Sequence, residues 1–391
     1  MPFILLIVIY LSFISLGLPD SLLGAAWPAM QSDLGTPVYA AGCISLIISC
    51  GTVISSLLAD GLLRRFSCGI VSGCSVLLTA VGMYGFSAAE SLRMLCLSAI
   101  PCGLGAGAVD AALNHYVAVH YPARHLLWLH CFWGIGCALS PVLMGAALQS
   151  GSGWQGGCRA VAMIQIVLTG MLFCALPLWR KTAVESEAQP HIPMRILLRM
   201  SGVPQTLLTV LCYAALESTA ILWASSFCVQ VRGMHPKTAA QAASLLFLGI
   251  TAGRLLCGFL TRRFGTQCLI RAGLCGIACG LLLLILPLPA PAACAGLIIL
   301  GTGCAPVSPC ITHDTPVRFG KAYAQELIGM QTSAAYIGTS LMPPLFGLLT
   351  QCAGMEVLPL FLAMFLAMTA LLTDPAVRAE SCPIPSPDNQ L

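Results

Sequence analysis

Five ionisable side chains stand in stretches of sequence that are otherwise almost wholly apolar. They are Asp20, Asp110, His130, Glu217 and Arg254. A charge at the centre of an apolar helix in a bilayer costs roughly 2.5–3.5 kcal/mol on insertion scales, so each needs a partner, a wet cavity or a proton. We therefore expect Asp20, Asp110, Glu217 and His130 to take part in proton coupling, because intramembrane carboxylates and histidines form proton relays.

A polar cluster is predicted from Asp110, Asn114 and His130. Asn114 lies one helical turn after Asp110 and shares its face. Depth counting at about 1.5 Å per residue places Asp110 and His130 at similar levels on consecutive antiparallel helices. The cluster would move a proton or bind substrate, with Asn114 as a substrate-binding candidate. The alternative is a hydrogen-bonded set that only orients two helices.

Asp20 lies in the stretch LGLPDSLLGAAWPAM, residues 16–30. Gly17, Pro19, Gly24 and Pro28 surround it and are expected to break the helix near mid-depth, where backbone carbonyls would face a cavity. Asp20 would then contact the proton or the substrate. The alternative is a buried acid that is bonded to a neighbouring helix.

Glu217 occupies the middle of a later apolar stretch, YAALESTAILW. An offset of 198 residues, which relates the two halves of the chain, places Glu217 opposite Pro19 and next to Asp20. Two carboxylates at short range cannot both ionise cheaply, so at least one is expected to hold a proton. Sodium is the alternative coupling ion, because it prefers several oxygen ligands and Ser218 and Thr219 lie beside Glu217.

Arg254 lies about 12 Å along its helix from Arg262, the nearest basic residue at the expected end of that helix. We expect it to act as a gate by pairing with an acid. Binding of an anionic substrate and a structural role are the alternatives.

Aromatic and amide side chains suggest a substrate class, because sugars stack on rings and bond through their hydroxyls. Tryptophan is also enriched at membrane interfaces, which is the alternative explanation. The predicted substrate-binding residues, besides Asn114, are Trp27, Trp133, Tyr213, Trp223, Gln331 and Tyr336.

The elements that position these residues follow from the composition. The chain has 391 residues, of which 58% are hydrophobic and 8% are charged. A soluble domain carries about 25% charged residues, so the bilayer is the expected solvent. With about 20 apolar residues per span, the sequence predicts twelve transmembrane helices, at roughly 3–27, 37–59, 67–88, 93–119, 126–148, 158–178, 203–228, 238–261, 267–288, 291–312, 325–350 and 354–374.

Several function classes are disfavoured. The apolar runs are too long and uniform for a transmembrane β-barrel. The 21 cysteines are scattered singly, which argues against a disulfide framework or a metal site. There is no phosphate-binding GxxxxGK[ST] loop and no catalytic Ser/His/Asp or Cys/His set, so we expect neither an enzyme nor a cofactor.

The basic residues predict the orientation. Thirteen of the 18 Lys and Arg residues lie in one alternating set of loops, and four lie in the other. This bias predicts a multi-pass protein of the cytoplasmic (inner) membrane with both termini in the cytoplasm. No basic face carries interleaved aromatics, so nucleic acid is not an expected partner.

The chain also repeats itself. GTVISSLLADGLLRRF at 51–66 aligns with GITAGRLLCGFLTRRF at 249–264, and the same offset relates Gly103 to Gly301. We therefore expect a six-helix half at 1–180, a cytoplasmic linker at 181–202 and a second half at 203–391. Parallel repeats of this kind are typical of secondary transporters, whose substrate site lies between the halves. The linker's PHIPMRILLRM, residues 190–200, is expected to form an amphipathic surface helix.

The repeated RRF loops resemble degenerate copies of the cytoplasmic signature loop of the major facilitator superfamily. They depart from it at Ser67, where a glycine is usual. GLPDSLLGAAWPAM, GLGAGAVDAALNHYVAVHYPARHLLWLHCFWGIG and IGMQTSAAYIGTSLMPPLFGLL resemble the fucose permease group of sugar:proton symporters. That group carries an essential acid in its first helix and another in its fourth. The resemblance therefore implies such roles for Asp20 and Asp110.

Together these features predict an all-α, twelve-helix transporter that moves a small polar solute, most simply a sugar, by proton-coupled symport. The alternative is a proton-driven exporter of drugs or metabolites. The expected partners are the small-molecule substrate, the proton or sodium, and the lipid bilayer, and the expected state is a monomer.

Overall fold

The computed structural model describes residues 3–121, 123–179, 194–261, 263–320 and 323–373, which form helices with no strand among them. The helices are α1 (Phe3–Leu34), α2 (Ala40–Arg65), α3 (Cys68–Ser87), α4 (Leu92–His120), α5 (Ala123–Gln149), α6 (Gly153–Cys174), α7 (Met194–Leu197), α8 (Val203–Gln230), α9 (Pro236–Leu260), α10 (Thr266–Ile285), α11 (Ala290–Cys304), α12 (Val307–Phe319), α13 (Ala324–Ala353) and α14 (Leu358–Thr373).

Twelve helical segments have the length of a membrane span. Eleven of them in the described residues are also apolar enough to cross a bilayer, and α13, with 30 residues, is the twelfth. The predicted all-α, twelve-span fold class is therefore confirmed. The tenth span consists of two helices, α11 and α12, because Pro306 has no backbone N–H with which to continue the helix. Tyr213 donates a hydrogen bond of 2.8 Å to the Cys304 carbonyl at this break.

The first span differs from the prediction. α1 is one unbroken helix with two prolines inside it, so the expected break around Asp20 is wrong. The glycines instead allow close packing of helices. A Cβ atom on Gly17 would lie 2.2 Å from the Trp133 carbonyl of α5, and one on Gly24 would lie 2.9 Å from the Ile221 carbonyl of α8.

The linker segment is helical over a shorter stretch than expected. Of the predicted surface helix at 190–200, the structure has only α7, and residues 190–193 lie outside the described residues. Leu197 is buried and packs with Val203, Phe319 and Leu327 of the second half. The end of the linker is therefore anchored to the second half by an apolar contact.

The sequence repeat is also a repeat of packing. A Cβ atom on Gly103 of α4 would lie 2.2 Å from the Ile48 carbonyl of α2. At an offset of 198 residues, a Cβ atom on Gly301 of α11 would lie 2.1 Å from the Leu246 carbonyl of α9. The same offset relates the contact of Gly105 with Thr79 to that of Gly303 with Ile277. Glycines at equivalent positions therefore bring equivalent helices together in the two halves.

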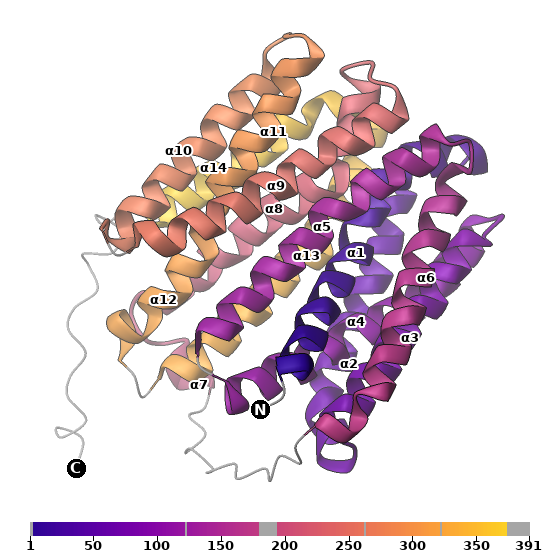
Figure 1. The fold of residues 1–391 in the computed structure, drawn as a ribbon. Coiled ribbons are helices and arrows are strands. Elements are labelled where there is room, and N and C mark those ends of the chain that lie inside the picture. The colour runs from indigo at the N-terminus through magenta and orange to yellow at the C-terminus, as the bar shows by residue number, and fades with distance from the viewer. Residues whose placement is uncertain (1–2, 122, 180–193, 262, 321–322, 374–391) are drawn as a thin grey trace, which may run out of the picture.

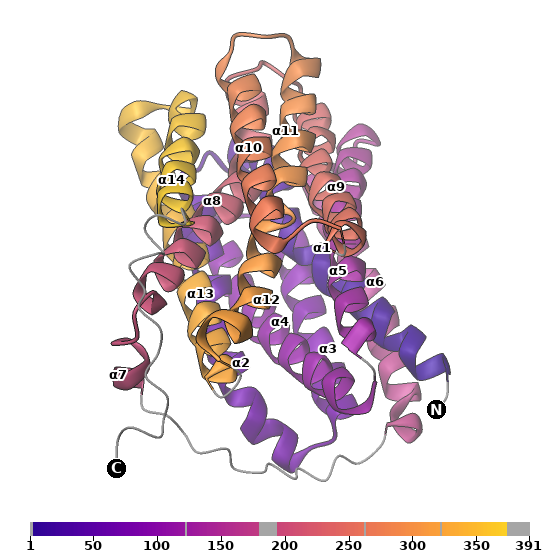
Figure 2. The ribbon, with the colours of Figure 1, turned by 90° about the vertical axis from the view of Figure 1, so that its left-hand side faces the viewer.

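The helices of the two halves form two groups. Figure 1 shows α1–α6, in indigo to magenta, mainly on one side of the bundle and α8–α14, in rose to yellow, mainly on the other. Figure 2 shows α10, α11 and α14 together at the outer face of the second group. The groups meet through the helix pairs α1–α8, α5–α9 and α2–α13.

The contacts between the halves are tight at one end of the bundle. We call the end where α1 begins and α8 begins the linker end, and the opposite end the far end. At the far end, a Cβ atom on Gly42 would lie 2.5 Å from Cα of Pro344, and one on Gly145 would lie 2.8 Å from Cγ of Gln241. The far end is thus closed by helices in close contact.

Candidate functional site

A cavity of about 550 Å³ lies between the two halves, near the middle of the helices. Helices from both halves line it, among them α1, α2, α4 and α5 from the first and α8, α9 and α13 from the second. All five ionisable residues that the sequence singled out contribute to its wall: Asp20, Asp110, His130, Glu217 and Arg254. Segments far apart in the chain therefore bring these groups to one place.

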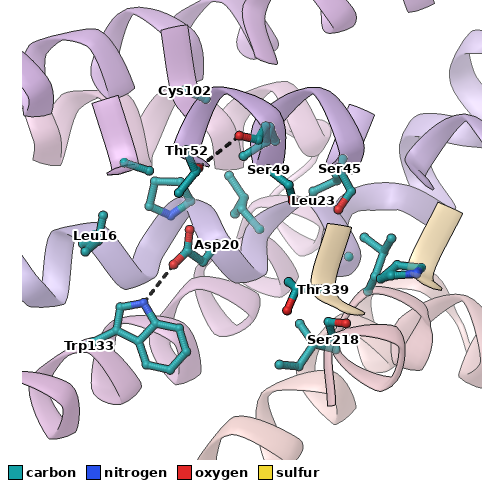
Figure 3. Close-up of a pocket in the computed structure, with 18 of the residues that line it drawn as sticks. Leu16, Asp20, Leu23, Ser45, Ser49, Thr52, Cys102, Trp133, Ser218 and Thr339 are labelled. Carbon is teal, nitrogen blue, oxygen red and sulfur yellow. Dashed lines mark hydrogen bonds between the residues drawn. The ribbon is translucent and has the colours of Figure 1, made fainter. Parts of the chain in front are cut away.

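Four side chains form a connected series across this cavity. The Trp133 indole N–H of α5 donates a hydrogen bond of 2.8 Å to the Asp20 carboxylate of α1, as Figure 3 shows. The guanidinium of Arg254 lies over the Trp133 ring, 5.6 Å from its centroid, within the range of a cation–π interaction. Arg254 is paired with Glu217 of α8 at an N–O distance of 3.6 Å. The series joins an acid of the first half to an acid of the second.

The charges of the cavity wall do not balance. Among the lining residues that the structure describes, Arg254 is the one Lys or Arg, and it faces three carboxylates. Arg254 pairs with Glu217, so Asp20 and Asp110 lack a lysine or arginine partner there. Their bonded partners are neutral donors. Trp133 holds Asp20, and Asn114 Nδ2 donates to Asp110 Oδ1 at 2.9 Å.

The predicted Asp110–Asn114–His130 cluster is present in part. The Asp110–Asn114 hydrogen bond forms along one face of α4, as the spacing predicted. His130 lines the same cavity, but its ring packs edge-on against Phe13, with centroids 6.0 Å apart. The two residues thus share a cavity without a hydrogen bond between them among the described contacts. Asn114 contacts Asp110 and is not itself part of the cavity wall.

The predicted gate residue has its acid partner within its own half. Arg254 of α9 pairs with Glu217 of α8, and both helices belong to the second half. Across the halves it lies over the Trp133 ring. The expected pairing with an acid is therefore found, and the gating role stays a prediction.

Besides Asn114, four of the predicted substrate-binding residues lie outside the cavity wall. Trp27 and Trp223 are wholly buried in the core, and the Trp223 indole donates to the Pro343 carbonyl at 3.0 Å. Tyr213 bonds to the α11–α12 break, and Gln331 Nε2 donates to Thr315 Oγ1 at 2.7 Å. In this conformation these side chains hold helices together, while Trp133 and Tyr336 do line the cavity.

The hydroxyl groups of Ser45, Ser49, Thr52 and Thr339 were not predicted as part of the wall, and Ser218 was considered only as a sodium ligand. Ser45, Ser49 and Thr52 share one face of α2, at spacings of four and three residues, and line the cavity. Ser218 of α8 and Thr339 of α13 lie opposite, as Figure 3 shows. A hydroxyl group that donates to its own helix still accepts hydrogen bonds. The spacing on α2 was the available signal in the sequence.

Two packed groups of span-length helices around a central cavity with ionisable side chains in its wall are the arrangement of a membrane transporter. The sequence model of the Major Facilitator Superfamily matches residues 9–343, so the chain belongs to this superfamily. It is a multi-pass membrane transporter and not an enzyme.

Individual relatives are more distant. The chain is 24% identical over 358 residues to an uncharacterized transporter, y4wD, of Sinorhizobium fredii, a match that covers 88% of this chain and 91% of that protein. A crystal structure of the nucleoside transporter NupG superposes with a TM-score of 0.78 at 13% identity, covering 95% of this chain and 98% of that one. A D-xylose–proton symporter superposes with a TM-score of 0.76 at 12% identity, covering 95% and 97%. These superpositions establish the shared fold.

Proposed function

We propose that the protein is a proton-coupled symporter for a small, multiply hydroxylated solute, most simply a sugar. The observation that carries the proposal is the excess of carboxylates over cations in the wall of one cavity between the halves. A carboxylate that must be enclosed without a cation is best neutralised by a proton. A transporter that closes around such groups therefore carries protons with its substrate.

Asp20 is the principal proton site in this proposal. Its side chain is exposed to the cavity, so a proton and a substrate can both reach it. Asp110 lines the same cavity and is held by Asn114. Glu217 is balanced by Arg254 and serves in the closing of the site, and His130 assists in proton transfer.

The substrate class follows from the neutral groups of the wall. Ser45, Ser49 and Thr52 of the first half and Ser218 and Thr339 of the second contribute hydroxyl groups to the cavity wall. Such groups donate to and accept from sugar hydroxyls at little desolvation cost, because they bear no charge. Trp133 and Tyr336 supply aromatic surface for the C–H faces of a sugar ring. That one structural relative is a nucleoside transporter and another a D-xylose–proton symporter agrees with a hydroxylated solute.

Transport proceeds by alternating access of the halves 1–180 and 203–391, joined by the linker 181–202. The structure corresponds to the state that is closed at the far end. With the positive-inside bias, the linker end and both termini face the cytoplasm, and the protein acts as a monomer in the cytoplasmic membrane.

The test is uptake into proteoliposomes of the purified protein with a panel of radiolabelled sugars. An imposed gradient, acidic outside, should drive accumulation above the external concentration, and a sodium gradient at equal pH should not. Asp33→Asn is a matched control, because Asp33 accepts from Trp154 outside the cavity and should leave accumulation unchanged. Loss of trapped solute driven by the same gradient would mean antiport and would contradict the proposal.

A further inference from the structure

Trp133 is the one side chain that contacts charged groups of both halves within the described cavity wall. Its N–H bonds to Asp20 in the first half, and its ring face supports Arg254 in the second. The two contacts use different parts of the indole, so a substitution can remove one and keep the other. Such a substitution distinguishes a role of Trp133 in coupling from a role in packing.

The strength of the first contact depends on the charge of Asp20. A hydrogen bond to an ionised carboxylate is shorter and roughly twice as strong as one to a neutral acceptor. When a proton from the water of the cavity binds a carboxylate oxygen of Asp20, a new O–H bond forms and the indole loses its charge-assisted acceptor. The indole is then held less firmly, and so is the guanidinium that lies over it.

Titratable and charged groups of several helices line the cavity around Asp20. From the neighbouring helices, Asp110 of α4, His130 of α5, Glu217 of α8 and Arg254 of α9 line the same cavity as Asp20. Tyr336 of α13 and the thiols Cys102 of α4 and Cys158 of α6 also line it. Of these groups, Arg254 contacts the Trp133 ring and Glu217 contacts Arg254. A change at Asp20 therefore has a continuous route to the Glu217–Arg254 pair through Trp133.

We propose that Trp133 is a positioning residue that transmits the protonation state of Asp20 to the Glu217–Arg254 pair and so couples proton binding to movement of the halves. The inference rests on the proposed function, because it specifies how the proposed proton site acts. Trp133 takes no proton itself in this role.

The chain contains a matched control. Trp154 donates through its indole N–H to Asp33 Oδ2 at 2.9 Å, the same type of contact as that between Trp133 and Asp20, but outside the cavity wall. Trp133→Phe removes the N–H and keeps a ring under Arg254. Its sugar accumulation against a proton gradient should fall about tenfold, the usual worth of a hydrogen bond to a charged group. Exchange of sugar at equal pH also tests the aromatic surface of the site, so it should fall less than accumulation does, and the ratio of accumulation to exchange should fall. Trp154→Phe should leave the ratio of accumulation to exchange unchanged.

A second measurement needs neither sugar nor transport. The protein has six tryptophans, so 5-fluorotryptophan labelling gives a small set of ¹⁹F resonances, and the one missing in Trp133→Phe or Trp133→Tyr is assigned to Trp133. The chemical shift of that resonance should change with pH in the wild type and should be independent of pH in Asp20→Asn. It should continue to move in Asp110→Asn and His130→Gln. Glu217→Gln should displace it at constant pH.

The outcomes separate the inference from the proposed function. Wild-type vesicles that accumulate no sugar with any proton gradient would contradict the function, while the ¹⁹F titration would still decide the role of Trp133. A Trp133 resonance that ignores pH, or that titrates equally in Asp20→Asn, would overturn the inference. So would an unchanged ratio of accumulation to exchange in a well-folded Trp133→Phe protein.

Discussion

The close approach of α1 and α8 beside the cavity, on its side towards the far end, makes Gly24→Ala a sensitive perturbation of the conformational equilibrium. The added Cβ would lie 2.9 Å from the carbonyl oxygens of Ile221 and Leu222, where ordinary contact begins at 3.4 Å. The two helices must then move apart by about 0.5 Å, because backbone atoms cannot yield as a flexible side chain does. Overpacking of this kind costs about 1–3 kcal/mol. The strain exists only while the far end is closed, so the population ratio should shift about 5–150-fold towards the state with the far end open.

Gly170→Ala in α6 is the control, because a Cβ there meets no other described atom within 4 Å. Hydrogen–deuterium exchange of the protein in nanodiscs measures the shift. In Gly24→Ala, peptides from residues 20–34 of α1 and 217–230 of α8 should exchange faster than in the wild type and the control. Equal exchange in all three proteins would refute the argument that this contact holds the far end closed.

Three further predictions follow from the cavity. Glu217→Gln should lower the free energy of unfolding by about 3 kcal/mol, because it leaves the Arg254 guanidinium without its countercharge. Glu217→Met combined with Arg254→Met should recover most of the loss, and a melting series in detergent in which the single and double variants melt together would contradict this. Ser49→Ala should raise the KM for the transported sugar about 2–10-fold with little change in maximal rate, and an unchanged KM would remove α2 from the binding site. His130→Ala should slow uptake and alter its pH profile, whereas a wild-type profile would reduce His130 to its packing against Phe13.

The twelve-span fold could be predicted because hydropathy and length are strong signals in membrane helices. The offset of 198 residues could also be found in the sequence. The structure gives Gly103 and Gly301, which this offset relates, equivalent contacts between helices. The break between α11 and α12 was missed because the apolar run continues through Pro306. The unbroken α1 was missed because glycine serves both flexible hinges and close helix packing, and the neighbour that distinguishes them is distant in sequence.

The ionisable residues of the cavity could be found because a charge in an apolar helix must face protein or water. The aromatic candidates were harder, because helices that are apolar on every face give no stripe that points to the cavity. Tyr213 is one turn from Glu217, yet it bonds to Cys304, while Glu217 lines the cavity. Ser45 and Ser49 were missed because serine is common in membrane helices and often bonds to its own helix.

The central claim is that a proton enters with the substrate at Asp20. The most direct measurement is the internal pH of vesicles that contain a trapped fluorescent pH indicator, recorded when a transported sugar is added outside at equal starting pH. We predict acidification of the interior by wild-type protein, in proportion to the sugar that enters. In Asp20→Asn we predict sugar exchange without acidification. Sugar entry without acidification in the wild type, or the same acidification in both proteins, would contradict the account.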